Sequence, residues 1–337
     1  MRRWPAIALL LPCAAWADYP MTYLGGTAGP IANRLSNLGW GLIGVSLLVA
    51  IFIALAVPVG ILRNRAKGYE GRVGPPVSHG GNGLPWVYIG VSVSALLLIG
   101  SAIWTFFVMA ATAAPPGNPK ITLDVTGHQW WWEVRYRKEG EPKRTFLTAN
   151  EIHIPVGQPV RIRLIGVDVI HSFWVPRLIG KTDVIPGQTN LAWIEADSPG
   201  VYRGQCTEYC GLQHAHMALH VVAQTPEKFK AWWDHQLQDA VPPTSPAARG
   251  GQRIFEQHCS VCHTVRGLGG NHGKLGPDLT HLMSRRMIAA GTLPNTTGYL
   301  AAWIENAPSL KPGVDMPTLA LPVKQLQAVL SYVQTLH

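Results

Sequence analysis

Long apolar stretches alternate with polar segments over the first third of the chain. Two of them, at residues 40–62 and 85–112, contain no charged residue. Each is longer than the roughly 20 apolar residues that span the hydrocarbon core of a bilayer. Such stretches are improbable as buried helices of a soluble protein, so we predict two transmembrane helices.

A shorter apolar run lies at the N-terminus and has the features of a targeting signal. Residues 1–17 combine two arginines, an apolar core and an A-x-A pattern ending at Ala17. This predicts a signal peptide cleaved after Ala17, which leaves residues 18–39 as an outer N-terminal segment. A lipoprotein lipidated on Cys13 is the alternative, and Pro12 fits it poorly.

The loop at residues 63–84 carries four Lys and Arg residues against Glu70 alone. The positive-inside rule places such a loop in the cytoplasm. Everything after about residue 112 then faces outward.

The pattern changes to short β-branched and aromatic runs, punctuated by Pro and Gly, over residues 118–224. This alternation predicts a β-sandwich. Residues 225–248 contain a helical stretch and most of the linker "VPPTSPAARG", and residues 249–337 have a mainly helical pattern. We therefore expect a multidomain membrane protein with a helical hairpin, a sandwich and an all-α domain.

Composition agrees with a membrane component, since 47% of the 337 residues are hydrophobic and 14% are charged. The net charge of +9 comes from scattered basic residues without a recognition motif, so we predict no nucleic-acid partner. From Arg249 onward eight Lys and Arg oppose four Asp and Glu, which suits an acidic donor or anionic lipid.

The sequence "CSVCH" gives the all-α segment its candidate chemistry. Cys259, Cys262 and His263 form the C-x-x-C-H pattern of covalent haem c attachment, in which the thiols bind the haem vinyls and the histidine binds iron. A disulfide is the alternative for any cysteine pair in an oxidising compartment.

The surroundings of this motif, with "KLGPDL" after it and "KPGVDMP" further on, resemble a class I cytochrome c over the whole segment. The resemblance implies that Met316 is the second axial ligand of the haem iron. Met283 and Met287 are rivals, but they lie on an apparent helical stretch and suit packing better.

A second group of metal-binding side chains lies in "CTEYCGLQHAHM", residues 206–217. Zinc has little use for a thioether, whereas thiolate, imidazole and a weak methionine on a β-sandwich are the ligands of a copper electron-transfer site. Two thiolates suit a pair of coppers that share both sulfurs. A further histidine is expected from an earlier strand, and "GVDVIHSFWVP" supplies His171.

These motifs, together with "GKTDVIPGQ" and "GHQWWW", resemble the CuA domain of cytochrome c oxidase subunit II. With the two apolar stretches and the cytochrome segment, the resemblance extends over essentially the whole mature chain. It is similar to bacterial variants that carry a fused cytochrome c domain. The implied sandwich is cupredoxin-like.

The resemblance also implies a ligand set for a binuclear CuA centre. The implied ligands are His171, Cys206, Glu208 through its backbone carbonyl, Cys210, His214 and Met217. The Glu208 side chain would bind a magnesium ion shared with subunit I, and a solvated carboxylate is the alternative. His216 is expected at the surface.

In the family, a tryptophan of the "GHQWWW" stretch is the point at which electrons arrive, which implies this role for Trp130, with core packing as the alternative. Trp131 and Trp132 are expected to serve packing or the membrane interface. One departure concerns the glutamate that family members usually have near the start of the second transmembrane helix. This chain has no acidic residue between Glu70 and Asp124.

The implied function is that of subunit II of a proton-pumping cytochrome c oxidase, which passes electrons from haem c to CuA and on to subunit I. Neither predicted span contains a histidine, so the oxygen-reducing site lies in another subunit. Implied partners are subunits I and III, membrane lipid, and cytochrome c or a quinol–cytochrome c reductase as donor. The implied location is the bacterial inner membrane, multi-pass, with both metal domains on the periplasmic side. A subunit of a nitric oxide reductase and a membrane-anchored electron shuttle remain as alternatives.

Overall fold

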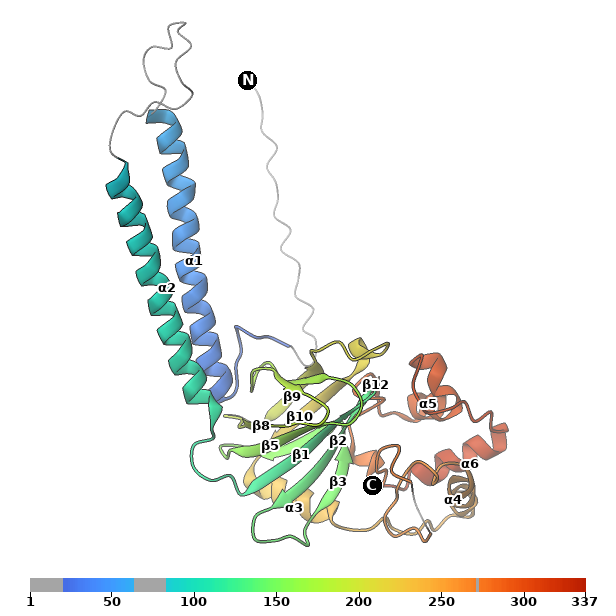
Figure 1. Ribbon diagram of the computed structural model, residues 1–337. Helices are drawn as coiled ribbons and strands as arrows, with labels where there is room; N and C mark the ends of the chain where they lie inside the picture. Colours follow the sequence, from blue (N-terminus) through green and yellow to red (C-terminus); the bar gives the residue numbers. More distant parts are fainter. Residues whose placement is uncertain (1–20, 64–82, 271–272) are drawn as a thin grey trace, which may run out of the picture.

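The computed structural model describes residues 21–63, 83–270 and 273–337 (Figure 1). The predicted signal peptide and most of the loop predicted to be cytoplasmic lie outside the described residues. Two long helices project to one side of a β-sandwich, and a smaller helical domain lies on another side of it.

The helices α1 (Pro30–Arg63) and α2 (Leu84–Ala113) form the projecting pair, and both are long and apolar enough to cross a membrane. The two helices approach closely at Gly41, where an added Cβ atom would lie only 2.2 Å from the Trp104 ring. The exposed apolar side chains along both helices are those expected where lipid or another subunit surrounds them.

The start of α1 lies earlier than the apolar pattern predicted, at Pro30 instead of residue 40. Its first turn belongs to the sandwich, because Ile31 is buried there and Ala28 exchanges backbone hydrogen bonds with Arg177 and Asp197. The hydropathy of the sequence identifies only the apolar part of such a helix, which is the part long enough to cross the bilayer. The C-terminal end of α2 is held to the sandwich as well, since the Trp193 indole donates to the carbonyl of Thr112 at 2.9 Å.

The sandwich consists of two five-stranded sheets, in the orders β3-β2-β1-β5-β8 and β4-β10-β9-β6-β7. Its strands are β1 (Ile121–His128), β2 (Trp131–Lys138), β3 (Phe146–Ala149), β4 (Glu151–Pro155), β5 (Val160–Gly166), β6 (His171–Trp174), β7 (Thr182–Val184), β8 (Thr189–Ile194), β9 (Gly200–Cys206) and β10 (Ala218–Gln224). The alternation is clear in β5, where Val160, Ile162 and Leu164 are fully buried. The predicted cupredoxin-like sandwich is confirmed.

One end of the second sheet positions the candidate metal ligands. Strand β9 ends at Cys206, and β6, which begins at His171, pairs with it antiparallel so that Phe173 lies opposite Cys206. The chain then forms a loop, passes through the 3-10 turn η1 (His214–His216), and enters β10 directly after Met217.

The helix α3 (Pro226–Gln236) leads from the sandwich to the helical domain, which contains α4 (Pro246–His258), α5 (Thr297–Leu310) and α6 (Val323–Val333). Helix α4 begins inside the predicted linker, because the Ser245 hydroxyl accepts from the Ala248 amide at 3.1 Å and caps its first turn. A Cβ on Gly251 would lie 1.8 Å from the carbonyl oxygen of Ala328, so a glycine permits the close crossing of α4 and α6.

The predicted helical stretch around Met283 and Met287 is wrong. Met283 lies in the 3-10 turn η2 (Leu282–Ser284), and Met287 begins a hairpin of β11 (Met287–Ile288) and β12 (Leu293–Pro294). Ala289, Ala290 and Gly291 all have positive φ in the hairpin turn. A helix cannot continue through three left-handed residues.

Candidate metal centre

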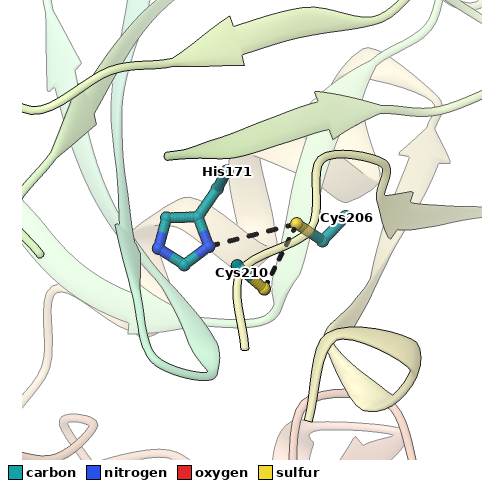
Figure 2. A group of neighbouring side chains, drawn as sticks. All are labelled: His171, Cys206 and Cys210. Carbon is teal, nitrogen blue, oxygen red and sulfur yellow. Dashed lines mark hydrogen bonds between the residues drawn. The ribbon is translucent and has the colours of Figure 1, made fainter. Parts of the chain in front are cut away.

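The loop between β9 and β10 and the start of β6 bring sulfur and nitrogen atoms together at one end of the sandwich (Figure 2). The Sγ atoms of Cys206 and Cys210 are 3.7 Å apart, and Nδ1 of His171 lies 3.9 Å from Sγ of Cys206. All three side chains are buried, and their ligand atoms lie within 4.8 Å of one another. Within the described part of the chain this is the one such cluster of His, Cys, Asp and Glu side chains.

The loop adds three more atoms to this network. Nδ1 of His214 is 3.5 Å and Sδ of Met217 is 3.9 Å from Sγ of Cys210, and the carbonyl oxygen of Glu208 is 3.4 Å from Sγ of Cys206. The structure therefore brings together all six atoms that the sequence predicted as ligands. The His216 side chain is exposed, and its backbone carbonyl accepts from Thr292.

The donor set and its spacing fit a pair of copper ions. The two sulfurs are too far apart for a disulfide bond of about 2.05 Å. Because metal–thiolate bonds are about 2.3 Å long, an ion between the sulfurs can contact both. Thiolates, imidazoles and a thioether are the soft and borderline donors that copper electron-transfer sites use.

The two thiols have different acidities. The hydrogen bond with Cys210 is the main reason why the pKa of Cys206 is lowered to about 4. The same contact and then burial raise the pKa of Cys210. Two thiolates at this distance repel each other, so a cation is needed before both can be ionised.

Asp168 contacts the His171 ring on the side that faces away from Cys206. The sequence did not predict this residue as part of the site. Its Oδ1 lies 2.8 Å from Nε2 of His171, which leaves Nδ1 facing Cys206. Burial alone would raise the pKa of Asp168, but hydrogen bonds from His171 and from the amides of Val169 and Gln129 lower it overall. The spacing D-x-x-H was visible in "DVIH", although only the strand geometry makes the two side chains meet.

Trp130 packs against the loop at Cys210 and Gly211. Its indole Nε1 donates to the carbonyl of Cys210 at 2.8 Å, and the Gln129 amide donates to the same oxygen at 2.7 Å. Trp130 is half-buried, whereas Trp132 is fully buried in the sandwich core. Trp131 stacks on His128 with ring centroids 4.5 Å apart.

The second candidate site lies at the end of α4. Cys259 ends the helix, and a tight turn follows in which the amide of His263 donates to the carbonyl of Cys259 at 2.9 Å. Nδ1 of His263 lies 2.8 Å from the carbonyl oxygen of Pro277, and this contact leaves Nε2 free to bind a metal.

This arrangement fits a haem. A Cβ on Gly276 would lie 2.5 Å from Cε1 of His263, so the "KLGPDL" turn packs directly on the imidazole edge. Cys259 and Cys262 are partly exposed free thiols, as attachment to a planar cofactor requires. Met316 is half-buried in the segment that joins α5 to α6, at the other end of the domain's sequence.

A copper loop on a cupredoxin-like sandwich, joined to a helical C-x-x-C-H domain, defines a two-centre electron-transfer protein. Residues 137–224 match the family described as cytochrome C oxidase subunit II, periplasmic domain, and residues 248–337 match cytochrome c. The chain belongs to the cytochrome c oxidase subunit II family and carries a fused cytochrome c domain.

Two relatives, both named cytochrome c oxidase subunit 2, agree with this. The chain is 39% identical to cytochrome c oxidase subunit 2 of Alkalihalophilus pseudofirmus over 65% of its own length and 62% of the relative's. It is 30% identical to that of Bacillus sp. strain PS3, over 72% of its length and 70% of the relative's. The periplasmic domain of subunit II of cytochrome oxidase of Bradyrhizobium japonicum is 30% identical, with 36% of this chain and 95% of that chain covered and a TM-score of 0.33. The family and the two apolar helices make this a membrane-anchored protein with a periplasmic domain.

Proposed function

We propose that this chain is the electron-receiving subunit of a proton-pumping cytochrome c oxidase. The main support for this proposal is a network of two thiols, two imidazoles and a thioether at one end of the sandwich. Neighbouring sulfur and nitrogen atoms of this network are 3.5–3.9 Å apart. When bound, CuA and haem c supply reversible one-electron chemistry between a donor and the oxygen-reducing site of subunit I.

The contacts within the loop support the following roles for the copper ligands. Cys206 and Cys210 would bridge the two copper ions, His171 and His214 would each bind one, and Met217 would be a weak ligand. Glu208 would bind through its backbone carbonyl. Cys206, Cys210, His171 and Met217 are buried, so this end of the sandwich excludes water and changes little when an electron arrives.

In the haem domain, Cys259 and Cys262 would hold the porphyrin, and His263 and Met316 would bind its iron. The Pro277 carbonyl fixes the tautomer of His263. Trp130, which touches the Cys210 carbonyl, would be the residue at which electrons reach the copper loop.

We also propose that the half-buried Glu208 side chain binds a magnesium ion at the boundary with subunit I, since a carboxylate oxygen suits this cation. Manganese exchanged into the purified complex would report the site by its EPR signal. Glu208→Gln should reduce the bound manganese, and Glu227→Gln, at an exposed position of α3, should not.

Subunits I and III, membrane lipid and a cytochrome c or quinol–cytochrome c reductase donor would complete the system in the inner membrane, with both helices spanning it. Purification of the tagged chain in mild detergent tests this. We expect a haem-bearing partner to copurify, with haem c and mixed-valence copper spectra and oxygen consumption. Isolation without that partner, or turnover of nitric oxide but not oxygen, would contradict the proposal.

The ligand assignment has its own test. Cys206→Ser should abolish the mixed-valence copper EPR signal, because a serine hydroxyl does not replace a bridging thiolate, and it should leave the haem c absorption band intact. Cys259→Ser should have the opposite effect. A copper signal that survives in Cys206→Ser would refute the assignment.

A further inference from the structure

Two segments of the cytochrome domain contact the copper-binding half of the molecule. In the turn between β11 and β12, the carbonyl of Ala290 accepts from the amide of Ala218 at 2.9 Å. After α5, the carbonyl of Pro312 accepts from the side chain of Gln213 at 2.7 Å. A Cβ on Gly313 would lie 2.7 Å from Leu212, so the two loops are in close contact.

Lys311 adds a further hydrogen bond between the two halves of the molecule. Its side chain is 2% exposed, and its ammonium donates to the carbonyl of Trp130 at 3.1 Å and to that of Ala289 at 3.2 Å. It forms no ion pair with a carboxylate of any described residue. Burial lowers the pKa of Lys311 to about 8, so a cation is held here at a cost in free energy.

The position of the contact links it to both candidate centres. Met316 follows Lys311 on the same connecting segment, and the Trp130 indole donates to the carbonyl of Cys210. Gln213 directly precedes His214. The segment that would bind the haem iron therefore contacts the copper-binding loop through the hydrogen bond from Gln213 to Pro312, and it contacts the Trp130 turn through the hydrogen bond from Lys311.

Glu151 and Arg286 form a second attachment between the sandwich and the cytochrome domain. The carboxylate of Glu151 is 5% exposed and accepts from the backbone amide of Arg286 at 2.9 Å, while its other oxygen lies 3.0 Å from Nε2 of His153. Two separate attachments, at Lys311 and at Glu151, restrict rotation of one domain on the other. A flexible tether alone would require neither.

We propose that Lys311 is a positioning residue that docks the cytochrome domain on the Trp130 loop, so that the electron passes within a fixed complex instead of after a diffusive swing. This rests on the proposed function, because it concerns transfer between the two centres. Fixed geometry matters because small displacements of reacting groups cost large factors in rate.

The docking itself can be tested without reference to the metals. Acetylation of the purified full chain by an N-hydroxysuccinimide ester, followed by mass spectrometry, measures how accessible each lysine is. Lys324, an exposed lysine of the same domain, should label roughly tenfold faster than Lys311 or more, if the docked state dominates. In Gln213→Leu, which removes the donor to Pro312, Lys311 should label faster. Equal labelling of the two lysines in the unmodified chain would overturn the proposal.

The consequence for electron transfer is tested in the oxidase complex by flash photolysis. Lys311→Met keeps most of the length of the side chain and removes the donor. The rate from haem c to CuA should fall by roughly tenfold or more and should become slower as glycerol raises the viscosity. The haem c and copper spectra of Lys311→Met should stay unchanged. Lys324→Met should behave as the unmodified chain.

The outcomes separate the two proposals. An unchanged rate in Lys311→Met, or a viscosity-dependent rate in the unmodified complex, would overturn the positioning role while leaving the oxidase function intact. Missing copper or haem spectra would contradict the proposed function, and the labelling comparison would still decide whether the domain is docked.

Discussion

Nε2 of His171 and a carboxylate oxygen of Asp168 lie 2.8 Å apart, on the side of the imidazole that faces away from Cys206. Asp168 is itself fixed by the amides of Gln129 and Val169. The contact between Asp168 and His171 sets the tautomer and the orientation of His171, a predicted copper ligand.

Asp168→Asn should weaken copper binding by about 10- to 100-fold, because the variant loses the charge that raises the basicity of His171. Copper affinity can be measured by titration against a competing chelator. Asp239→Asn, at an exposed position after α3, is the control. Equal affinities for both variants would show that Asp168 has no part in the site.

Copper removal should lower the thermal stability of the sandwich, because metal bound only to the folded state stabilises it. At a free copper concentration about 1,000 times the Kd, this amounts to roughly 4 kcal/mol. Calorimetry of the full chain with and without copper measures the change. In Cys206→Ser the two traces should coincide, and a remaining shift would point to copper bound elsewhere.

Acid should destabilise the sandwich through His220. The His220 side chain is 2% exposed, and burial lowers its pKa to about 4. The unfolded chain, with a histidine pKa near 6.5, binds a proton first, so stability falls as the pH drops from about 6.5 to 4. The loss would approach roughly 3 kcal/mol at the acid end.

Urea unfolding followed by tryptophan fluorescence at several pH values measures this loss. His220→Gln should reduce the slope of stability against pH in that window. His216→Gln changes an exposed histidine of the neighbouring loop and serves as the control. A slope that His220→Gln leaves unchanged would assign the acid sensitivity to other groups.

Trp132→Leu should cost about 3 kcal/mol of stability, because it leaves a cavity in the sandwich core. The Trp132 indole is fully buried and lies edge-on to His171 and Phe173, with ring centroids 5.9 and 5.8 Å away. The variant should also broaden the copper EPR signal as His171 loses its support. Leu191→Ala, on an exposed part of β8, should change stability by less than about 0.5 kcal/mol.

Local patterns predicted the architecture well where one physical requirement dominates. Both apolar helices were predicted from uncharged apolar stretches long enough to cross a bilayer. The sandwich was predicted from short β-branched and aromatic runs punctuated by Pro and Gly. The pattern was less informative where two environments meet. The first turn of α1 packs on the sandwich, so hydropathy placed its start too late, and left-handed residues 289–291 interrupt a stretch with a helical composition.

The sequence alone predicted the candidate donors of the copper loop, because residues 206–217 place five of them within one short segment. The choice of copper also needed His171, the predicted sandwich and the family resemblance. The surroundings of these donors depend on the tertiary structure. His171 reaches Cys206 from 35 residues away through the pairing of β6 with β9, and Lys311 reaches Trp130 from 181 residues away across a domain boundary. Such contacts depend on strand pairing and domain packing, which no local pattern encodes.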